Sequence, residues 1–216
     1  MDSIAIKNGY YIPLLYPLIH ILTGDTFLAT IVVLKAFPAN YFYWYAHHYD
    51  YWEGYNWVKQ FVHLTDSGHF VSFFYWITPD YLPLAFTIHF VITAGFWYGK
   101  AVFNMKDRDR LYLPELDLKF QEIWSTANHG VPLLLLAYHI RTNDQCYPFT
   151  YRELENAYLW MYGWLFLIYI PWRVFTGDIV YDSLSLETPK KSALFFSSIH
   201  VIVLLGHLTG YLLSRC

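Results

Sequence analysis

The sequence predicts an all-α polytopic membrane protein, a bundle of about six transmembrane helices forming a single domain over residues 1–216. Of the 216 residues, 56% are hydrophobic, 22% are aromatic and 14% are charged. A soluble domain carries about 25% charged residues. The net charge of −3 gives no indication of a nucleic-acid partner. The partners that we expect are membrane lipids and a lipid substrate, and the oligomeric state stays open.

Six stretches reach the length of about 20 mainly apolar residues that a membrane helix needs. The first, residues 11–37, is interrupted by Thr23-Gly24-Asp25, and it is either one span with a buried acid or two half-spans. A tight turn at Pro79 and Pro83 leads into the third stretch. The remaining five stretches cover 57–77, 82–103, 121–140, 155–175 and 192–213.

Two polar connections have different characters. Residues 38–56 are rich in Tyr and Trp, which is typical of a segment at the level of the lipid headgroups. Residues 104–120 are rich in basic residues, and the positive-inside rule places them in the cytoplasm. Six spans would then leave both termini on the other side, unless the first stretch is re-entrant. Of the two cysteines, Cys146 and Cys216, one disulfide is possible, and no CxxC metal motif occurs.

The polar stretch 63–69 lies inside a segment that otherwise reads as membrane-spanning. Ionisable side chains at membrane depth cost about 2.5–3.5 kcal/mol each, so they occur mainly where they pair, line a cavity or do chemistry. His63 and Asp66 share a helix face, as do Asp66 and His69. A carboxylate can orient an imidazole, and Thr65 or Ser67 offers a hydroxyl nearby. The other interpretation is a purely structural cluster of polar side chains that holds the helices of the bundle together.

A second polar pair, Asn128-His129, comes early in the fourth stretch and precedes Pro132. Proline has no N–H and frees a backbone carbonyl, which suits the wall of a cavity. The alternative is a proline kink with an incidental histidine. For His20, His89 and His139, we expect hydrogen bonds between helices.

His200 and His207 in the sixth stretch suggest a metal alternative. Together with His63 and Asp66 they offer ligands for zinc. Residues seven apart are separated by roughly 10 Å of helical rise, too far for both histidines to bind the same ion. A haem held by two histidines is a lesser alternative, since the fifth stretch has no histidine.

Several short motifs occur in an order that resembles the androgen-induced protein / androgen-dependent TFPI-regulating protein family of multi-span membrane hydrolases and their bacterial relatives. The resemblance covers about residues 57–182. The motifs are Gln60-Phe61-Val62-His63-Leu64-Thr65-Asp66, Phe96-Trp97, Asp107-Arg108-Asp109-Arg110-Leu111-Tyr112 with Asp117, Asn128-His129-Gly130, Arg141-Thr142 with Tyr147-Pro148, and Thr176-Gly177-Asp178-Ile179-Val180-Tyr181.

This resemblance implies a threonine hydrolase that cleaves fatty-acid esters of hydroxy fatty acids with an intramembrane Thr and His. The family's histidine corresponds to His129. Its threonine position corresponds to Val62 or His63, two or three residues before Thr65. Asp182 stands where the family has proline. The family and the missing signal peptide point to the endoplasmic reticulum or another endomembrane.

We therefore expect a lipid-ester hydrolase without a cofactor. His129 is the expected general base and Thr65 the nucleophile, with Asp66 or His63 orienting the base. Asn128 is the candidate oxyanion donor, and Ser67 belongs to the same substrate-binding group. The first rival is a zinc-dependent intramembrane lipid hydrolase or amidase built on His63, Asp66, His200 and His207. The second is a non-enzymatic lipid-binding or regulatory membrane protein.

Overall fold

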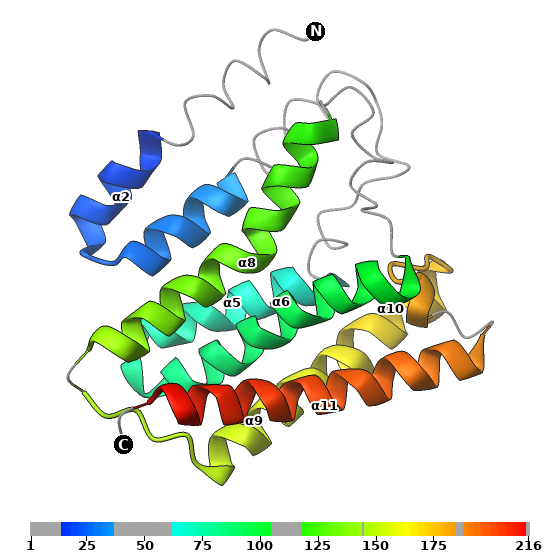
Figure 1. Cartoon of the computed structure of the whole chain (residues 1–216). Coiled ribbons are helices and arrows are strands. Elements are labelled where there is room, and N and C mark those ends of the chain that lie inside the picture. Colours follow the sequence, from blue (N-terminus) through cyan, green and yellow to red (C-terminus); the bar gives the residue numbers. More distant parts are fainter. Residues whose placement is uncertain (1–13, 37–61, 105–117, 144, 185–187, 215–216) are drawn as a thin grey trace, which may run out of the picture. The chain divides into compact units, whose positions relative to one another are not determined.

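The computed structural model of the chain describes residues 14–36, 62–104, 118–143, 145–184 and 188–214 (Figure 1). Within these ranges the regular elements are helices and no strand occurs, which confirms the all-α prediction. The chain divides into two compact units, one of residues 1–57 with 108–128 and one of residues 58–107 with 129–216. The expectation of a single domain stays a prediction. The aromatic loop and most of the basic loop lie outside the described residues.

In the first unit, the stretch predicted at 11–37 contains two separate helices. Helix α2 (Leu15–Thr23) ends at Gly24, whose φ of 67° is left-handed and whose N–H donates to the carbonyl of His20. Asp25 then caps the next helix (Thr26–Ala36), because its Oδ1 accepts the N–H of Leu28 at 2.8 Å. The acid in this stretch is therefore a helix cap, which decides between the two interpretations left open by the sequence in favour of two helices.

The second unit contains the remaining helices, which follow the predicted stretches closely. α5 (Leu64–Ile77) is the described part of the second stretch, and η2 (Pro79–Tyr81) makes the tight turn. α6 (Leu82–Phe103) is the third stretch and α8 (Leu118–Thr142) the fourth, with α8 entering this unit at His129. The fifth consists of α9 (Tyr151–Gly163), the π-helical η3 (Trp164–Tyr169) and α10 (Ile170–Thr176). η4 (Asp182–Leu184) precedes α11 (Pro189–Leu213), the sixth.

Helix α6 is the centre of this unit and packs against α5, α9 and α11 (Figure 1). It carries no Asp, Glu, Lys or Arg before Lys100. A helix that is apolar all round is stable only when buried on several sides. Accordingly Leu82 and Ile88 are fully buried, and Ile88 belongs to a core shared with Met161 of α9 and Val203 of α11.

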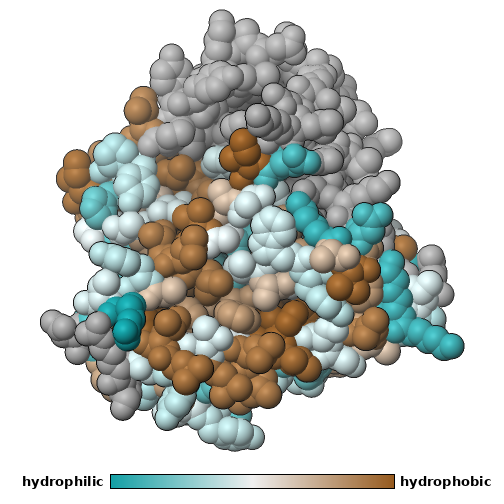
Figure 2. Space-filling model, in the orientation of Figure 1, coloured by the Kyte–Doolittle hydropathy of each residue, from teal (hydrophilic) through white to brown (hydrophobic). Residues whose placement is uncertain are grey.

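Two helices within the described residues are long and apolar enough to cross a membrane, the Pro79–Phe103 helix and Pro189–Leu213. They support an association with membranes. Large apolar side chains are also exposed on the outer helices, where Figure 2 shows hydrophobic residues spread over the part of the visible face that α11 occupies in Figure 1. The exposed side chains include Leu134 and Tyr138 of α8, Leu159 of α9, Phe166 and Leu167 of η3, and Val201, Leu205 and Leu212 of α11.

The contact between α5 and α6 depends on a glycine. A Cβ built at Gly68 would lie 2.8 Å from Cγ2 of Ile88 and closer still to Cδ1 of Ile92. We expect Gly68→Ala to lower the free energy of unfolding by about 1–3 kcal/mol, because the two isoleucines must move within a packed core. Thermal unfolding of the detergent-solubilised protein measures the change.

Gly163→Ala is the matched control. Gly163 has helical dihedral angles and no heavy atom within 4 Å of its ideal Cβ. Alanine there should be neutral or stabilise by up to about 1 kcal/mol. Equal melting temperatures for the two variants would contradict the proposed close approach of α5 and α6.

Candidate functional site

Thr65 and His129 meet in the second unit, although 64 positions separate them in the sequence. The hydroxyl oxygen Oγ1 of Thr65 lies 2.9 Å from Nε2 of His129. Thr65 is the second residue of α5 and is 7% exposed, whereas His129 on α8 is half-buried. When Nε2 carries no proton, the threonine hydroxyl donates to it, which is the arrangement that a general base requires.

The beginning of α5 is held by groups from other parts of the chain. The N–H of Leu64 donates to the hydroxyl of Tyr181 at 2.9 Å. The indole Nε1 of Trp164 donates to the carbonyl of Val62, also at 2.9 Å. The N-cap residue, His63, makes no capping hydrogen bond with its side chain. Tyr181 therefore accepts an N–H of the first turn, as a capping side chain does in most helices, and Trp164 holds the carbonyl just before it.

The π-helical element η3 supplies this support. A π-helical turn shifts the side chains that follow it around the helix axis, and such turns are frequent at functional sites. Here the turn buries Trp164 and Tyr169. The Tyr169 hydroxyl lies 3.4 Å from the carbonyl oxygens of both Tyr181 and Leu184. The turn thereby connects the segment that bears Tyr181 to the beginning of α5.

His129 is held by two residues of α6. The ring of Phe96 stacks on the imidazole with the centroids 3.9 Å apart and an interplanar angle of 12°. The hydroxyl of Thr93 donates a short hydrogen bond to the carbonyl of His129. Pro132 deprives the carbonyl four residues before it, that of Asn128, of its helical donor. Thr93 thus binds the carbonyl of His129, the residue that follows Asn128, whose carbonyl the proline frees.

A cation also contacts the ring of Phe96. The Nζ atom of Lys100, one turn after Phe96 on α6, is 4.3 Å from the centroid of the Phe96 ring and 5.9 Å from that of Trp97. Lys100, Phe96, His129 and Thr65 therefore form a continuous series of contacts.

The other expected site residues have different surroundings. His63 packs edge-on against Tyr181, with ring centroids 6.2 Å apart. Asp66 lies in the first turn of α5. Ser67 accepts a hydrogen bond from Nε1 of Trp160 at 3.3 Å and so belongs to the contact between α5 and α9. The side-chain oxygen of Asn128 is buried and has no hydrogen-bond partner among the described residues.

The four residues of the zinc alternative are dispersed among separate contacts. His200 pairs with the hydroxyl of Tyr162 at 2.6 Å, and His207 packs edge-on against Phe149. No group of three or more His, Cys, Asp or Glu that could hold a metal ion occurs in the part of the chain that the structure describes.

Two other histidines also pair with hydroxyl groups. The expected hydrogen bond between helices is confirmed for His89, whereas the partner of His139, Tyr147, lies in the connection after α8. Nε2 of His89 lies 2.6 Å from Oγ of Ser72, across the contact of α5 with α6. The hydroxyl of Ser72 donates its proton to the carbonyl of Gly68 within its own helix, so this proton stabilises the helix. His139 lies 3.3 Å from the hydroxyl of Tyr147. Hydrogen bonds between a histidine and a hydroxyl group thus occur repeatedly in the described part of the chain and serve its structure.

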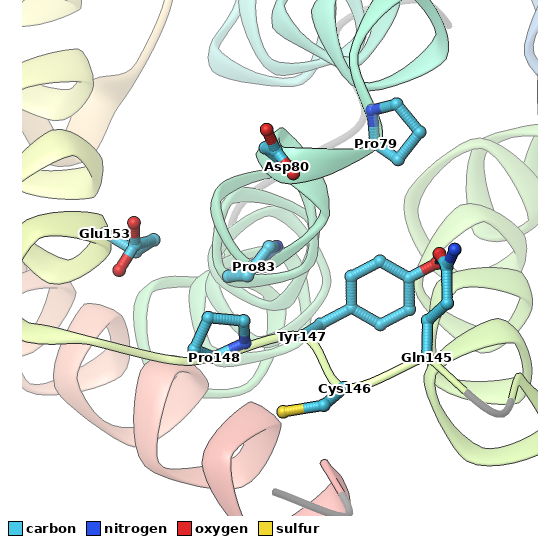
Figure 3. Close-up of a pocket in the computed structure, with 8 residues that line it drawn as sticks. All are labelled: Pro79, Asp80, Pro83, Gln145, Cys146, Tyr147, Pro148 and Glu153. Atoms are coloured by element: carbon cyan, nitrogen blue, oxygen red, sulfur yellow. Dashed lines mark hydrogen bonds between the residues drawn. The ribbon is translucent and has the colours of Figure 1, made fainter.

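A separate pocket of about 460 Å³ lies at the end of the unit where α6 begins (Figure 3). Burial raises the pKa of Tyr147, one of its lining residues, although a hydrogen bond from Asn143 opposes the shift. Cys146 is disulfide-bonded, and the other cysteine, Cys216, lies outside the described residues. The pocket is lined by Pro79, Asp80, Pro83, Gln145, Cys146, Tyr147, Pro148 and Glu153.

Comparison of the chain with protein-family models, with curated proteins and with solved structures found no match. The resemblance described above therefore stays a prediction. Two of its motifs nevertheless contribute to the site, because Phe96 contacts His129 and Tyr181 holds the beginning of α5.

The roles of Trp164, Thr93 and Lys100 were missed by reasoning from the sequence. Their partners lie on other helices, and each residue type is ordinary in a membrane protein. Only the isolated position of Lys100, the first charged residue of an otherwise uncharged helix, could have drawn attention to it.

Replacing Tyr181 tests whether it holds α5. Tyr181→Phe keeps the ring and removes the acceptor of the Leu64 N–H, which should cost about 1 kcal/mol. We expect faster amide hydrogen exchange in the peptide that contains Leu64 and Thr65. Tyr211→Phe, at an exposed tyrosine of α11, is the control. Unchanged exchange in Tyr181→Phe would show that other contacts hold the beginning of the helix.

Proposed function

We propose that this chain is an intramembrane hydrolase of lipid esters in which Thr65 is the nucleophile and His129 the general base. The observation that carries the proposal is the 2.9 Å contact of Oγ1 with Nε2 at the start of a helix. An alcohol is a weak nucleophile and needs a base within hydrogen-bond reach. The supports on both residues, Phe96 stacked on the imidazole and Tyr181 at α5, favour a fixed geometry.

In the proposed reaction, Nε2 of His129 takes the proton of Thr65 while Oγ1 attacks the ester carbonyl carbon. The tetrahedral intermediate collapses, and the leaving alcohol takes the proton from the imidazolium. Water, deprotonated by the same imidazole, then releases the fatty acid and restores the hydroxyl of Thr65. Asp66 or His63 would orient the base.

The N-terminus of α5 is suited to stabilise the oxyanion. The first N–H groups of a helix have no acceptor within the helix, and the helix dipole is positive there. Leu64 donates its N–H to Tyr181, and the first bond within the helix runs from Ser67 to His63. The N–H of Thr65 belongs to the same first turn and points toward the helix start. This donor, with Asn128 as a further candidate, would bind the oxyanion.

The proposed substrate is a lipid with an ester at membrane depth, such as a fatty-acid ester of a hydroxy fatty acid. Exposed apolar side chains on the helices would allow acyl chains to reach the site from the bilayer. Phe70 and Phe74 of α5 and Trp97 of α6 are examples. An active site between helices at this depth needs no aqueous transport of the lipid.

We further propose a multi-pass arrangement with up to six spans. Besides α6 and α11, α8 has 25 residues, and α9, η3 and α10 follow one another without interruption. The exposed leucines and aromatic residues on these helices would be costly in water but suit lipid. An endomembrane such as the endoplasmic reticulum is the proposed location.

Charge and disulfide chemistry together support one orientation. Lys100 lies at the end of α6, and Lys191 at the start of α11 contacts the ring of Phe103 nearby. Cys146 belongs to the opposite end, where α6 begins. Lysines favour the cytoplasmic side and disulfides an oxidising compartment. The proposed orientation therefore places Lys191 toward the cytoplasm and Cys146 toward the lumen.

A non-enzymatic, lipid-binding role is the second candidate. It is favoured by two other histidine–hydroxyl pairs with structural roles. His89–Ser72 joins α6 to α5, and His139–Tyr147 joins α8 to the segment that follows it. In that case Thr65 and His129 would contribute only to stability.

Substitution of Thr65 and His129 decides between the hydrolase and the non-enzymatic, lipid-binding role. We expect His129→Ala to lower kcat/KM for a fatty-acid ester of a hydroxy fatty acid by at least about 100-fold, because the general base is lost. Thr65→Val should abolish acyl transfer, whereas Thr65→Ser should keep measurable turnover, since the hydroxyl remains. Mass spectrometry of the released fatty acid measures the rates with purified protein.

Thr209→Val is the control, since within the described residues the Thr209 hydroxyl donates only to the carbonyl of Leu205 in its own helix. It should leave kcat/KM unchanged. Folded His129→Ala and Thr65→Val proteins with the turnover of the original chain would contradict the proposed mechanism.

The orientation can be tested with single cysteines at the two ends. In sealed microsomes, a membrane-impermeant maleimide should label Lys190→Cys directly and Asp80→Cys only after permeabilisation. Both positions are exposed in the structure. The reverse pattern would invert the proposed orientation, and equal labelling of both before permeabilisation would contradict a spanning α6.

A further inference from the structure

We propose that Lys100 binds an anionic group of the lipid, so that the protein selects esters that carry a carboxylate or a phosphate near the ester bond. This inference rests on the proposed hydrolase function. It is carried by the position of Nζ, which lies 4.3 Å from the ring that stacks on His129.

The ammonium group of Lys100 and the Thr65–His129 pair are spaced along the helix axis as the charged group and the ester are spaced in an amphiphilic lipid. Lys100 is in the last turn of α6, and Phe96 is one turn earlier. One helical turn corresponds to about 5.4 Å along the axis. A lipid whose charged group lies beside Lys100 at the end of the helix would therefore carry its ester toward Thr65 and His129, further into the bundle.

The direction of the Lys100 side chain suits this task. A lysine in the last turn stabilises the helix dipole, and its long chain can reach the interface. Both purposes would be served by a side chain that extends away from the core. Here Nζ lies instead over Phe96 and near Trp97. The ammonium group is thus kept on the side of α6 that faces His129.

A nearby lysine provides a matched comparison. Nζ of Lys191 lies 5.9 Å from the ring of Phe103, at the same end of the unit. Its aromatic partner contacts Tyr98 and Phe195 and is not the ring that stacks on His129. A general effect of positive charge at this end would involve both lysines, whereas recognition of the substrate would involve Lys100 alone.

The experiment compares charged and neutral esters in the full-length protein. The first pair is a fatty-acid ester of a hydroxy fatty acid and its methyl ester, and the second is a lysophosphatidate and the corresponding monoacylglycerol. For each pair, the ratio of kcat/KM for the charged to the neutral lipid is measured in the original chain and in Lys100→Met, Lys100→Arg and Lys191→Met. We expect Lys100→Met to lower the ratio about tenfold or more in one pair, as for the loss of a charge-assisted hydrogen bond.

The pair whose ratio falls identifies the anion as carboxylate or phosphate. Lys100→Arg should retain most of the ratio, and Lys191→Met should retain all of it. An unchanged ratio in Lys100→Met, or an equal loss for charged and neutral lipids, would overturn the role of Lys100 and leave the hydrolase proposal intact. Absence of hydrolysis of all four lipids by the folded original chain would overturn both.

Discussion

The position of Thr65 depends on how the beginning of α5 is held. A helix normally begins at a capping side chain, but His63 at the N-cap makes no such bond. Tyr181 and Trp164, from segments more than a hundred residues away, bind the backbone on either side of His63 instead. The hydroxyl of Thr65 in this first turn lies against Nε2 of His129. A capping side chain would bind an N–H of the first turn, where the oxyanion is proposed to lie.

Much of the fold was predictable, because uncharged apolar runs of sufficient length have few alternatives to a helix. The limits of α6 agree with the third predicted stretch for this reason. The stretch around Asp25 was ambiguous, since a carboxylate can be a cap or a buried charge, and only the left-handed Gly24 decides the matter. His129 and Thr65 could be named as candidates from the cost of burying polar groups. Their pairing with each other, and the contacts with Phe96 and Tyr181, depend on how distant helices pack.

The histidines show why a hydrogen bond to a hydroxyl does not by itself identify a catalytic pair. His89 is completely buried, and Ser72 also donates to a carbonyl of its own helix. That pair closes a helix contact. His129 is only half-buried, and Thr65 lies in the first turn of α5. The difference between the two pairs lies in their burial and in the positive end of a helix beside the oxygen of Thr65.

In the proposed hydrolase, the series from Lys100 to Thr65 would combine two tasks. The ester would have to reach a buried nucleophile, and the charged part of the lipid would have to remain near water. Phe96 contacts both groups, because its ring stacks on the imidazole and lies 4.3 Å from the ammonium nitrogen. The helix would set the distance between the anion and the ester. The proposed selection of charged lipids would then follow from the one helical turn that separates Lys100 from Phe96.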